Sequence, residues 1–547
     1  MKLVLDVETN SHHSHIWMVV TKELETGTVL CHTESSTLEG LIERSELVIG
    51  HNLIGFDQPI LKRLWNIHIP PKIVFDTLIV SRLMKPDIAD GHSLEAWGRR
   101  LNFPKIDYTE WDSPDLEEME KYCTQDVLLT EKLYQHELAT LKAQKFSDYS
   151  VKLEHDVAWI IKEQEDNGVL VDERGMMLLS GQVADDLTKI EKELVDMFEP
   201  TVVQMKTKTK VIPFNPGSRQ QIIDRLKARG WKPTEFTEKG NVILNEEILK
   251  ESNIPEAALF LKYFELQKIK SFLTNWSEKI GPDGRIHGKV ISNGAVTGRM
   301  THSSPNLGQV PSASTELGKA CRALFTVHDG HDLVGIDASG LELRMLAHYM
   351  QDSDYVAAVC EGRQEDKTDI HSVNQAAAGL KTRAQAKTFI YAYLYGAGDE
   401  KIGKIAEGNS HVGRKLKEKF LANTPALKSL QYKIARIADK GSVPGLDGRR
   451  LYVRSAHKAL NTLLQGAGAV VMKVALVLFK TRLVEASIPH KFVLNVHDEW
   501  QLEVPSEFSK QVAEMGVQAI RDTAKELNLR CPLDGEAKIG KNWYETH

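Results

Sequence analysis

Apolar residues gather in short runs at both ends of the chain, and acidic residues follow closely on these runs. The alternation from Leu3 to Glu8 predicts a strand with Asp6 and Glu8 on one face, because side chains alternate along a strand. In the C-terminal half, the runs that precede Asp337 and Asp498 indicate two buried strands. Residues 1 to about 145 alternate short strands with helices, which predicts an α/β unit.

Helical periodicity dominates the next part of the chain. An amphipathic pattern covers residues 152–197, with a break at Asn167-Gly168 and a short apolar strand after it. Turn and capping residues predict two more helices, over 218–230 and 255–280. We therefore expect a largely helical part from roughly 150 to 285.

A further predicted helix repeats a pattern every four residues between the two acid-tipped strands. The residues of this pattern are Arg383, Lys387, Tyr391 and Tyr395. All four share one broad face of a helix, where the cations suit phosphate oxygens and the rings suit a base and sugar. Two carboxylates that hold divalent metal, with a cationic helix for a triphosphate, are what nucleotidyl transfer requires. Each fragment alone is common in structural positions, so the prediction depends on their joint occurrence.

The N-terminal unit carries a second set of acids. Asp6 and Glu8 are followed by Asp57 in HNLIGFD, and later by Tyr122 and Asp126, four residues apart on a predicted helix. Four carboxylates and a tyrosine can hold two metal ions and orient a water molecule toward a phosphodiester. The chain therefore carries two separate candidate metal sites.

Three segments, GIDASGLELR, RAQAKTFIYAYLYGAG and NVHDEWQLEV, resemble motifs A, B and C of the family A DNA polymerases, the group of bacterial DNA polymerase I. Together with LDGRRLYVRSAHKALNTLLQGAGA, they are most similar to the replicative polymerases of short-tailed phages. The resemblance implies an α/β, RNase H-like exonuclease domain of the DEDD type, then an α+β right-hand polymerase. The implied ranges are 1–145 for the exonuclease and 146–547 for the polymerase, with the thumb at about 150–285, the palm at about 286–350 and 445–547, and the fingers at about 352–440.

The resemblance also implies roles for individual residues. Implied metal ligands and catalytic residues of the polymerase are Asp337, Asp498, Glu499 and the backbone carbonyl of Ala338. Implied nucleotide-binding residues are Glu342, His371, Arg383, Lys387, Tyr391 and Tyr395, with Arg383 and Lys387 also counted as catalytic. Implied DNA contacts are Arg299, Arg322, Asn461, Gln465 and His497. Glu342 matches the residue that excludes ribonucleotides, and tyrosine at position 391 is associated with acceptance of dideoxynucleotides.

The N-terminal acids, in their order along the chain, resemble the DEDD-type 3′–5′ exonucleases with a tyrosine in the third motif. This implies a catalytic Tyr122 and the metal ligands Asp6, Glu8, Asp57 and Asp126. We expect two Mg²⁺ ions in each site, with Mn²⁺ able to substitute. The expected partners are primer–template DNA, dNTPs and a replisome helicase and primase, and we expect the chain to act as a monomer.

One segment differs from the phage enzymes. In the best-known phage branch, a long thumb insertion binds host thioredoxin, and its place here lies between Phe198-Glu199-Pro200 and Phe214-Asn215-Pro216. Only Thr201 to Pro213 separate them, which is too few residues for a subdomain with its own core. We therefore expect no thioredoxin clamp.

Composition limits the choice of function without deciding it. With 42% hydrophobic and 26% charged residues, the chain is typical of a globular protein of two or more domains. Its net charge of -6 means that DNA must be bound by local basic runs, such as 206–210, 414–419 and 449–458. Five scattered cysteines without a CxxC pair argue against a zinc site and for a reducing compartment.

We expect no membrane segment, because no uninterrupted apolar run approaches eighteen residues. The expected location is the cytoplasm, that of the host cell if a phage encodes the chain. Three alternatives remain open at this stage: a nuclease whose C-terminal half only grips DNA, a non-enzymatic DNA-binding scaffold, and an RNA polymerase. The complete acid and cation sets argue against the first two, and Glu342 argues against the third.

Overall fold

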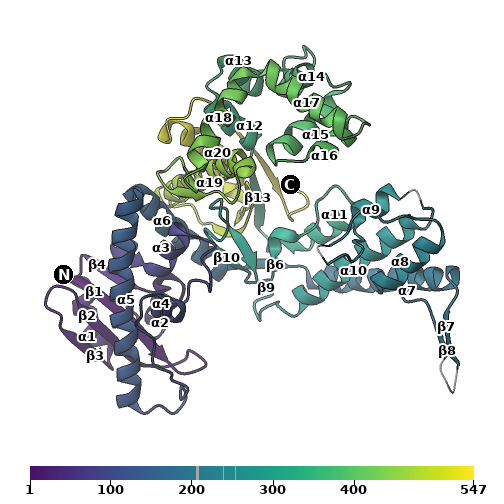
Figure 1. Cartoon of the computed structure of the whole chain (residues 1–547). Coiled ribbons are helices and arrows are strands. Elements are labelled where there is room, and N and C mark those ends of the chain that lie inside the picture. Colours follow the sequence, from purple (N-terminus) through teal and green to yellow (C-terminus); the bar gives the residue numbers. More distant parts are fainter. Residues whose placement is uncertain (205–208, 238, 253) are drawn as a thin grey trace.

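The computed structural model describes residues 1–204, 209–237, 239–252 and 254–547. An N-terminal unit built on a sheet lies beside a larger body with a sheet at its centre (Figure 1). Two helical lobes extend from this central sheet, and the C-terminus lies between them (Figure 1). The predicted basic run 206–210 falls largely outside the described residues.

The N-terminal unit is a five-stranded sheet in the order β3-β2-β1-β4-β5. Its strands are β1 (Lys2–Thr9), β2 (Ile16–Glu23), β3 (Val29–His32), β4 (Leu47–Gly50) and β5 (Val74–Asp76). Strand β1 pairs antiparallel with β2 and parallel with β4, so it lies in the middle of the sheet. The helices are α1 (Ser35–Glu43), α2 (Gln58–Trp65), α3 (Thr77–Met84), α4 (Leu94–Arg100) and α5 (Leu116–Gln144).

Alternation along β1 decides which face carries acids. Leu5 and Val7 pack into one buried cluster with residues of α1, whereas Val4 packs into another with residues of α5. Asp6 and Glu8 follow Val4 at intervals of two, so they point toward α5. The helix predicted to carry Tyr122 and Asp126 is confirmed as α5.

The central sheet is antiparallel, in the order β16-β17-β13-β18. Its strands are β13 (His331–Ala338), β16 (Lys491–Val496), β17 (Glu499–Pro505) and β18 (Gly535–Gly540). Two long helices, α19 (Ala459–Glu485) and α20 (Ser509–Glu526), share a buried cluster with Val334 and Ile336 of β13. The predicted strands before Asp337 and Asp498 are therefore confirmed as β13 and β16 of one sheet, with β17 between them.

One helical lobe continues from the central sheet through α12 (Leu341–Met350). Its other helices are α13 (Ser353–Cys360), α14 (Ile370–Ala378), α15 (Arg383–Leu394), α16 (Asp399–Ile405), α17 (Ser410–Asn423) and α18 (Pro425–Ala438). The short strands β14 (Ser442–Pro444) and β15 (Arg450–Tyr452) lead back from this lobe to α19.

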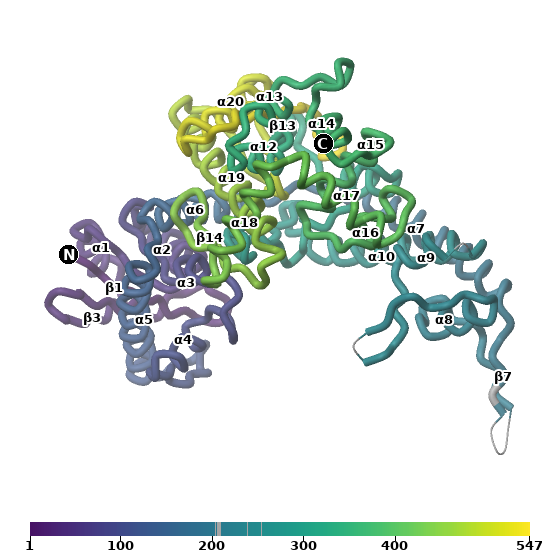
Figure 2. The backbone as a smooth tube through the Cα atoms, turned by 45° about the horizontal axis from the view of Figure 1, so that its top comes forward, coloured from purple at the N-terminus to yellow at the C-terminus, as the bar shows by residue number. Residues whose placement is uncertain are grey.

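The second lobe is an elongated arm. Its helices are α7 (Glu173–Met197), α8 (Arg219–Ala228), α9 (Glu246–Glu251) and α10 (Ala257–Ser277). A hairpin of β7 (Thr201–Gln204) and β8 (Thr209–Ile212) projects from the arm (Figure 2). Short pieces join the arm to the centre: β6 (Val169–Val171), β9 (Arg285–Ile286), β10 (Lys289–Ile291), β11 (Thr301–Ser303), α11 (Glu316–Ala323) and β12 (Phe325–Thr326).

Helix α6 (Asp148–Asn167) corrects one predicted boundary. The sequence places it at the start of the helical part at 150–285, and the predicted break at Asn167-Gly168 is confirmed. Its buried residues Leu153, Val157 and Ile160, however, share a cluster with α19 and the central sheet, not with α7 to α10. The first helix of the predicted thumb range is therefore part of the central core.

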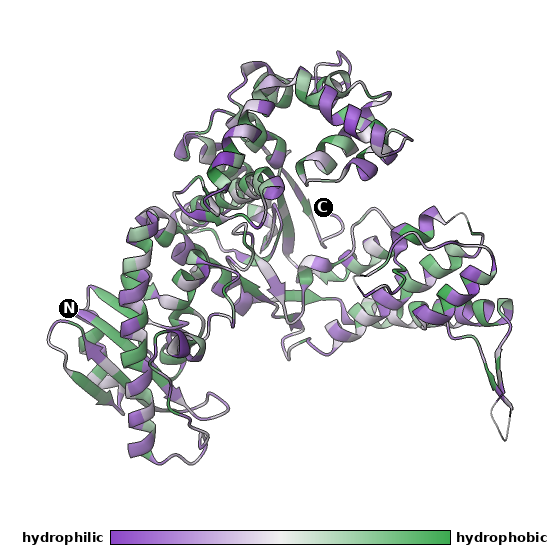
Figure 3. Ribbon diagram, in the orientation of Figure 1, coloured by the Kyte–Doolittle hydropathy of each residue, from purple (hydrophilic) through white to green (hydrophobic). Residues whose placement is uncertain are grey.

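Helix α19 is long and apolar enough to span a membrane by length and composition alone. Within the described residues, however, 78% of its most apolar window is buried inside the protein. The ribbon coloured by hydropathy shows apolar residues concentrated where helices meet the central sheet (Figure 3). We therefore interpret α19 as the core helix of the molecule.

Candidate active sites

Asp337 and Asp498 lie at neighbouring ends of the central strands. Asp337 is near the end of β13, where it pairs in register with Glu499 of β17. Asp498 lies in the two-residue turn between β16 and β17, and its carbonyl oxygen accepts a 3.1 Å hydrogen bond from the Ala338 N–H. His497 begins this turn with a φ of 57°, a left-handed conformation that suits tight hairpin turns.

The two aspartates repel each other. Loss of solvation and the nearby charges of Asp498 and Glu499 raise the pKa of Asp337 to about 6. Burial also raises the pKa of Asp498, although Arg299 opposes this shift. A divalent cation between the carboxylates would remove the repulsion, so the electrostatics of the pair fit a metal site.

Glu499 differs from the two aspartates. It is 5% exposed, and its carboxylate oxygens lie 2.7 Å from Trp543 Nε1 and 2.8 Å from His547 Nδ1. Gln501 donates a further hydrogen bond to it. Burial alone raises the pKa of Glu499, but the hydrogen bonds from His547 and Gln501 outweigh it and the pKa is lowered. In this arrangement Glu499 is held by protein donors, and His547 is a contact that the sequence reasoning missed.

The predicted phosphate-binding residues meet at α14 and α15. Arg383 is tied to Asp369, with Nε 3.0 Å from the carboxylate, whereas Lys387 is exposed and forms no ion pair with any described residue. The ring of His371 lies 6.3 Å from that of Tyr391, and its buried Nδ1 has no hydrogen-bond partner among the described atoms. Among the described residues of this group, Lys387 is therefore the cation open to a ligand, and His371 Nδ1 is a buried ring nitrogen without a partner.

Tyr395 lies at the end of the predicted helix. Helix α15 ends at Leu394, and Tyr395 is its C-cap because Gly396 turns the chain with a φ of 76°. Its hydroxyl donates a 2.6 Å hydrogen bond to Oε1 of Glu342 on α12. The same oxygen lies 3.4 Å from Nη2 of Arg299. Three predicted residues from different elements therefore meet beside Asp498.

The predicted DNA contacts fall into two groups. Asn461 and Gln465 are the only residues between 459 and 476 that are not buried, and they are one turn apart on α19. Arg322 is instead 6% exposed, with its guanidinium stacked 4.3 Å from the centre of the Trp543 ring and Nε bonded to Pro311. The structure therefore leaves Asn461 and Gln465 accessible and places Arg322 in the core.

The N-terminal acids converge below α5. Ligand atoms of Asp6, Glu8 and Cys123 all lie within 4.8 Å of one another. Asp126 and Tyr122 come from α5, and Asp57, 2% exposed, comes from the π-helical turn η1 (Leu53–Asp57). The five residues predicted from three separate segments therefore belong to one end of the sheet, although Asp57 and Asp126 lie outside the tight group.

A buried aspartate that the sequence reasoning missed supports Asp57. Asp76, at the end of β5, accepts hydrogen bonds from the N–H groups of Asn52 and Ile54, at 2.9 and 3.0 Å. It also caps α3 through the N–H of Leu78. These hydrogen bonds hold the conformation of the turn that carries Asp57.

The acid cluster is electrostatically strained without cations. Burial and the charge of Asp6 raise the pKa of Glu8 to about 10 and that of Asp126 to about 7. Burial also raises the pKa of Asp57, and Asp126 Oδ1 is buried without a hydrogen-bond partner. Buried acids with a free oxygen are what a site for hard divalent cations would offer.

Lys105 is the cation of this site, and no sequence pattern pointed to it. Its Nζ lies 2.5 Å from Asp126 Oδ2 and 4.9 Å from the centre of the Tyr122 ring. Lys105 belongs to the loop between α4 and α5, whose Tyr108 and Trp111 rings lie 5.5 and 5.6 Å from that of Tyr122. This loop therefore forms one wall of the N-terminal site.

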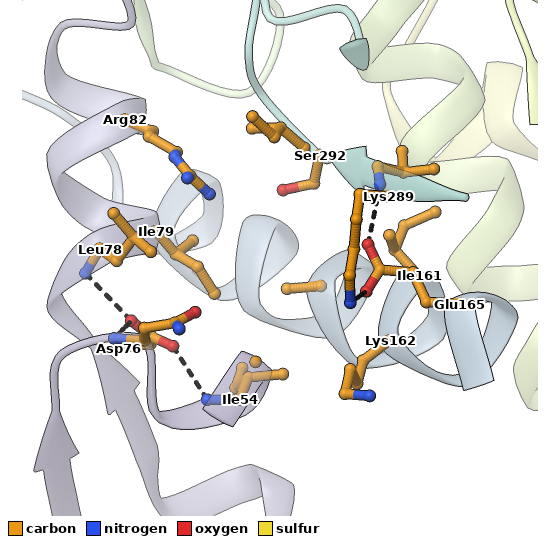
Figure 4. Close-up of a pocket in the computed structure, with 15 residues that line it drawn as sticks. Ile54, Asp76, Leu78, Ile79, Arg82, Ile161, Lys162, Glu165, Lys289 and Ser292 are labelled. Atoms are coloured by element: carbon orange, nitrogen blue, oxygen red, sulfur yellow. Dashed lines mark hydrogen bonds and ion pairs between the residues drawn. The ribbon is translucent and has the colours of Figure 1, made fainter. Parts of the chain in front are cut away.

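A cavity of about 260 Å³ separates the N-terminal unit from the central body. Residues from η1, β5, α3, α6 and β10 line it, and Arg82 points into it (Figure 4). Lys289 of β10 forms a 3.0 Å ion pair with Glu165 of α6 on its far wall (Figure 4). The two candidate sites thus lie in separate parts of the molecule.

A family model for DNA polymerase family A matches residues 179–545. The DNA-directed DNA polymerases of Enterobacteria phage T3 and Escherichia phage T7 are each 32% identical over 670 aligned positions, which cover 93% of this chain and 94% of each relative. The thermostable DNA polymerase I of Thermus aquaticus is 28% identical, over 72% of this chain and 48% of its own length.

The fold has a close relative among solved structures. The POL domain of Pol1 from M. smegmatis, in complex with DNA primer-template and dNTP, superposes with a TM-score of 0.83. The match covers 100% of this chain and 96% of that chain at 18% identity, so it supports the fold alone. The matched family model and the two phage relatives together show that this chain belongs to DNA polymerase family A.

Proposed function

We propose that the chain is a template-directed DNA polymerase that extends a primer with dNTPs and removes primer ends with a separate 3′–5′ exonuclease. The observation that carries the polymerase is the Asp337 and Asp498 pair, joined by the Ala338 hydrogen bond, with Lys387 left unpaired on α15. Membership of family A and the phage DNA-directed DNA polymerases, which match along 93% of the chain, support this function.

Divalent cations, in our proposal Mg²⁺, complete the polymerase site. Bound between Asp337 and Asp498, they would supply charge for the attacking and leaving oxygens of an in-line displacement. Lys387 and Arg383 would bind the triphosphate. Arg383 would first have to exchange its ion pair with Asp369 for contacts with phosphate oxygens. Asn461 and Gln465, accessible on α19, would contact the primer–template.

Glu342 gives the proposal its sugar specificity. Tyr395 and Arg299 hold its carboxylate in one place, so a ribose 2′ hydroxyl at that position would meet a fixed side chain. A side chain that two partners hold in place cannot move aside for the extra hydroxyl, and such a built-in clash discriminates against the competing sugar. The proposed substrate is therefore a deoxyribonucleoside triphosphate.

The exonuclease is supported by the converging N-terminal acids. Asp6, Glu8, Asp57 and Asp126 would hold Mg²⁺, and Tyr122 would orient the attacking water. The raised pKa values of the acids fit a site that needs cations to ionise fully. A proofreading role follows if the same primer end can reach both sites.

In this proposal the parts of the polymerase have the usual right-hand roles. The central sheet with α19 and α20 is the palm, the lobe of α13 to α18 the fingers, and the arm of α7 to α10 the thumb. The arm ends in a short hairpin, so we propose that no thioredoxin clamp binds there.

Separate mutation of the two sites tests the proposal. Asp337→Asn or Asp498→Asn should abolish extension of a primed template with Mg²⁺ and dNTPs while primer degradation without dNTPs continues. Asp6→Ala with Glu8→Ala should do the reverse and raise the error rate. Degradation that persists in the second variant would contradict the exonuclease, and extension that persists in the first would contradict the polymerase.

A further inference from the structure

Lys105 is unusual among the residues around the N-terminal acids. No other lysine or arginine in the described part of the chain forms an ion pair with Asp6, Glu8, Asp57 or Asp126. It lies in the loop between α4 and α5, not on a strand or helix that carries the acids. Its side chain is 21% exposed, whereas that of its partner Asp126 is 3% exposed.

The loop that carries Lys105 is anchored on the same sheet. Trp17 of β2 donates a 2.8 Å hydrogen bond from Nε1 to the carbonyl of Trp111, and Ser11 Oγ donates to Asp112 at 2.8 Å. Phe103 packs below Lys132 of α5, whose Nζ lies 4.4 Å from the ring centre. Lys105 is therefore presented by a fixed wall.

The ammonium group has capacity for a second partner. An ammonium carries three N–H donors, and the contact with Asp126 occupies one of them. The ring centre of Tyr122 lies 4.9 Å from Nζ, and the Lys105 side chain is 21% exposed, so an anion can approach a remaining donor from solvent. An anion that bound beside Tyr122 could accept from Lys105 without breaking its bond to Asp126.

Charge balance indicates which anion this is. Four carboxylates, three of them buried, repel a phosphodiester, and two divalent cations would only neutralise the carboxylates themselves. The phosphodiester, which gains charge as water attacks it, still lacks a counter-charge. Among the lysines and arginines that the structure describes, Lys105 alone forms an ion pair with one of these acids, so it lies where this counter-charge is needed.

We propose that Lys105 binds the phosphodiester that the nuclease site cleaves, and that it acts as a catalytic residue of that site by direct contact with the phosphate oxygens. This inference rests on the exonuclease proposed above. It adds to the acids and tyrosine a substrate-binding cation on the wall formed by residues 101–115.

Three variants separate this role from a structural one. Lys105→Gln removes the charge, Lys105→Arg keeps it, and Lys132→Gln removes a cation that packs on the same loop without touching the acids. Binding of a fluorescent dT tetramer is measured by anisotropy at several salt concentrations, with Ca²⁺ replacing Mg²⁺ so that binding is measured apart from cleavage. Degradation of the same tetramer with Mg²⁺ is then followed at saturating enzyme.

We expect Lys105→Gln to weaken binding about tenfold and to slow degradation by about tenfold to a hundredfold. The plot of log affinity against log salt should become less steep by about 0.7, the value for one lost single-strand phosphate contact. Lys105→Arg should stay within about threefold of the wild type in both assays, and Lys132→Gln should match it. Primer extension should be unchanged in all three variants.

The failures are distinguishable. An unchanged salt slope in Lys105→Gln would overturn the phosphate contact even if degradation slowed. Equal losses in Lys105→Gln and Lys105→Arg would show that the side chain only packs. A wild-type chain that leaves the tetramer intact would instead overturn the exonuclease itself, and the salt slope would then still report whether Lys105 binds phosphate.

Discussion

Two tyrosines of α15, Tyr391 and Tyr393, differ in burial and in the partner of their hydroxyl groups. Tyr391 is half-buried on α15, with its ring centre 6.3 Å from that of His371, and we propose that its hydroxyl contacts the sugar of a bound nucleotide. Tyr393 lies on the same helix but is buried, and its hydroxyl accepts a 2.8 Å hydrogen bond from Gln431. The pair offers a matched test of one hydroxyl group.

Tyr391→Phe should raise discrimination against dideoxynucleotides by about tenfold to a hundredfold, the worth of one hydrogen bond of about 1.5–3 kcal/mol. The hydroxyl can replace the missing 3′ hydroxyl of the analogue, and phenylalanine cannot. Competition between dNTP and ddNTP in a primer-extension ladder measures this. Tyr393→Phe should leave the ladder unchanged, and an equal effect of both variants would remove the role of Tyr391.

The raised pKa of Asp337 predicts that its ionisation lowers the folding stability of the metal-free protein. An acid whose pKa rises from 3.8 to about 6 on folding stabilises the fold below pH 3.8 and loses that stabilisation as pH rises through 6. For a fully buried group the shift would correspond to about 3 kcal/mol. The side chain of Asp337 reaches solvent, which reduces this to about 1 kcal/mol.

In EDTA, Asp337→Asn should therefore raise the melting temperature at pH 8 and leave it unchanged at pH 4. Addition of Mg²⁺ at pH 8 should stabilise the wild type more than the variant, because only the wild type has a pair of charges to neutralise. Calorimetry at the two pH values measures both effects. A variant that is less stable than the wild type at pH 8 would contradict the repulsion.

At the scale of elements, a buried ion cluster joins α6 to α19. Glu154 Oε1 lies 2.5 Å from Lys473 Nζ and 2.7 Å from Arg449 Nη1. Arg449 also forms a 2.7 Å ion pair with Asp447. All four residues are buried. Removal of one partner from a buried ion pair is costly, because the other charge is left without compensation.

Glu154→Gln should therefore destabilise the protein by about 3 kcal/mol or more, since it leaves Lys473 with no partner. Lys473→Met should cost less, because Glu154 keeps its ion pair with Arg449. The change also removes a charge whose burial is unfavourable, since burial lowers the pKa of Lys473 to about 8. Denaturant midpoints of the two variants give the comparison. Equal losses would contradict the prediction, because they would mean that the cluster depends on Lys473 as much as on Glu154.

Elements also show what the sequence could predict. The period of two in β1 placed Asp6 and Glu8 on one face, and the period of four placed Arg383 and Lys387 together, since both depend only on local geometry. Lys105 and His547 follow no period, because their contacts depend on how a loop and the C-terminal segment pack. Helix α15 ends where the resemblance implies, at Tyr395 and Gly396, because Gly396 takes a φ of 76°.

At the scale of the molecule, we propose that the arm of α7 to α10 affects how long the chain stays on DNA. Its hairpin contains only β7, β8 and their connection, and Val202 and Val211 are each 58% exposed. An alignment of 670 positions is longer than this chain of 547 residues, so the phage T3 and T7 enzymes carry segments that it lacks. The hairpin is too small to bury a core of its own.

Purified thioredoxin should therefore leave the extension length on a long primed template unchanged. Binding to an exposed hairpin of this size could bury too little surface for a stable complex, which needs roughly 1,200–2,000 Å² in total. Single-hit extension with a DNA trap, with and without thioredoxin, measures the effect, and a polymerase that carries the insertion serves as the positive control. A several-fold gain in product length for the wild type, lost when Val202 and Val211 are changed to serine, would contradict the prediction and make the hairpin a docking site.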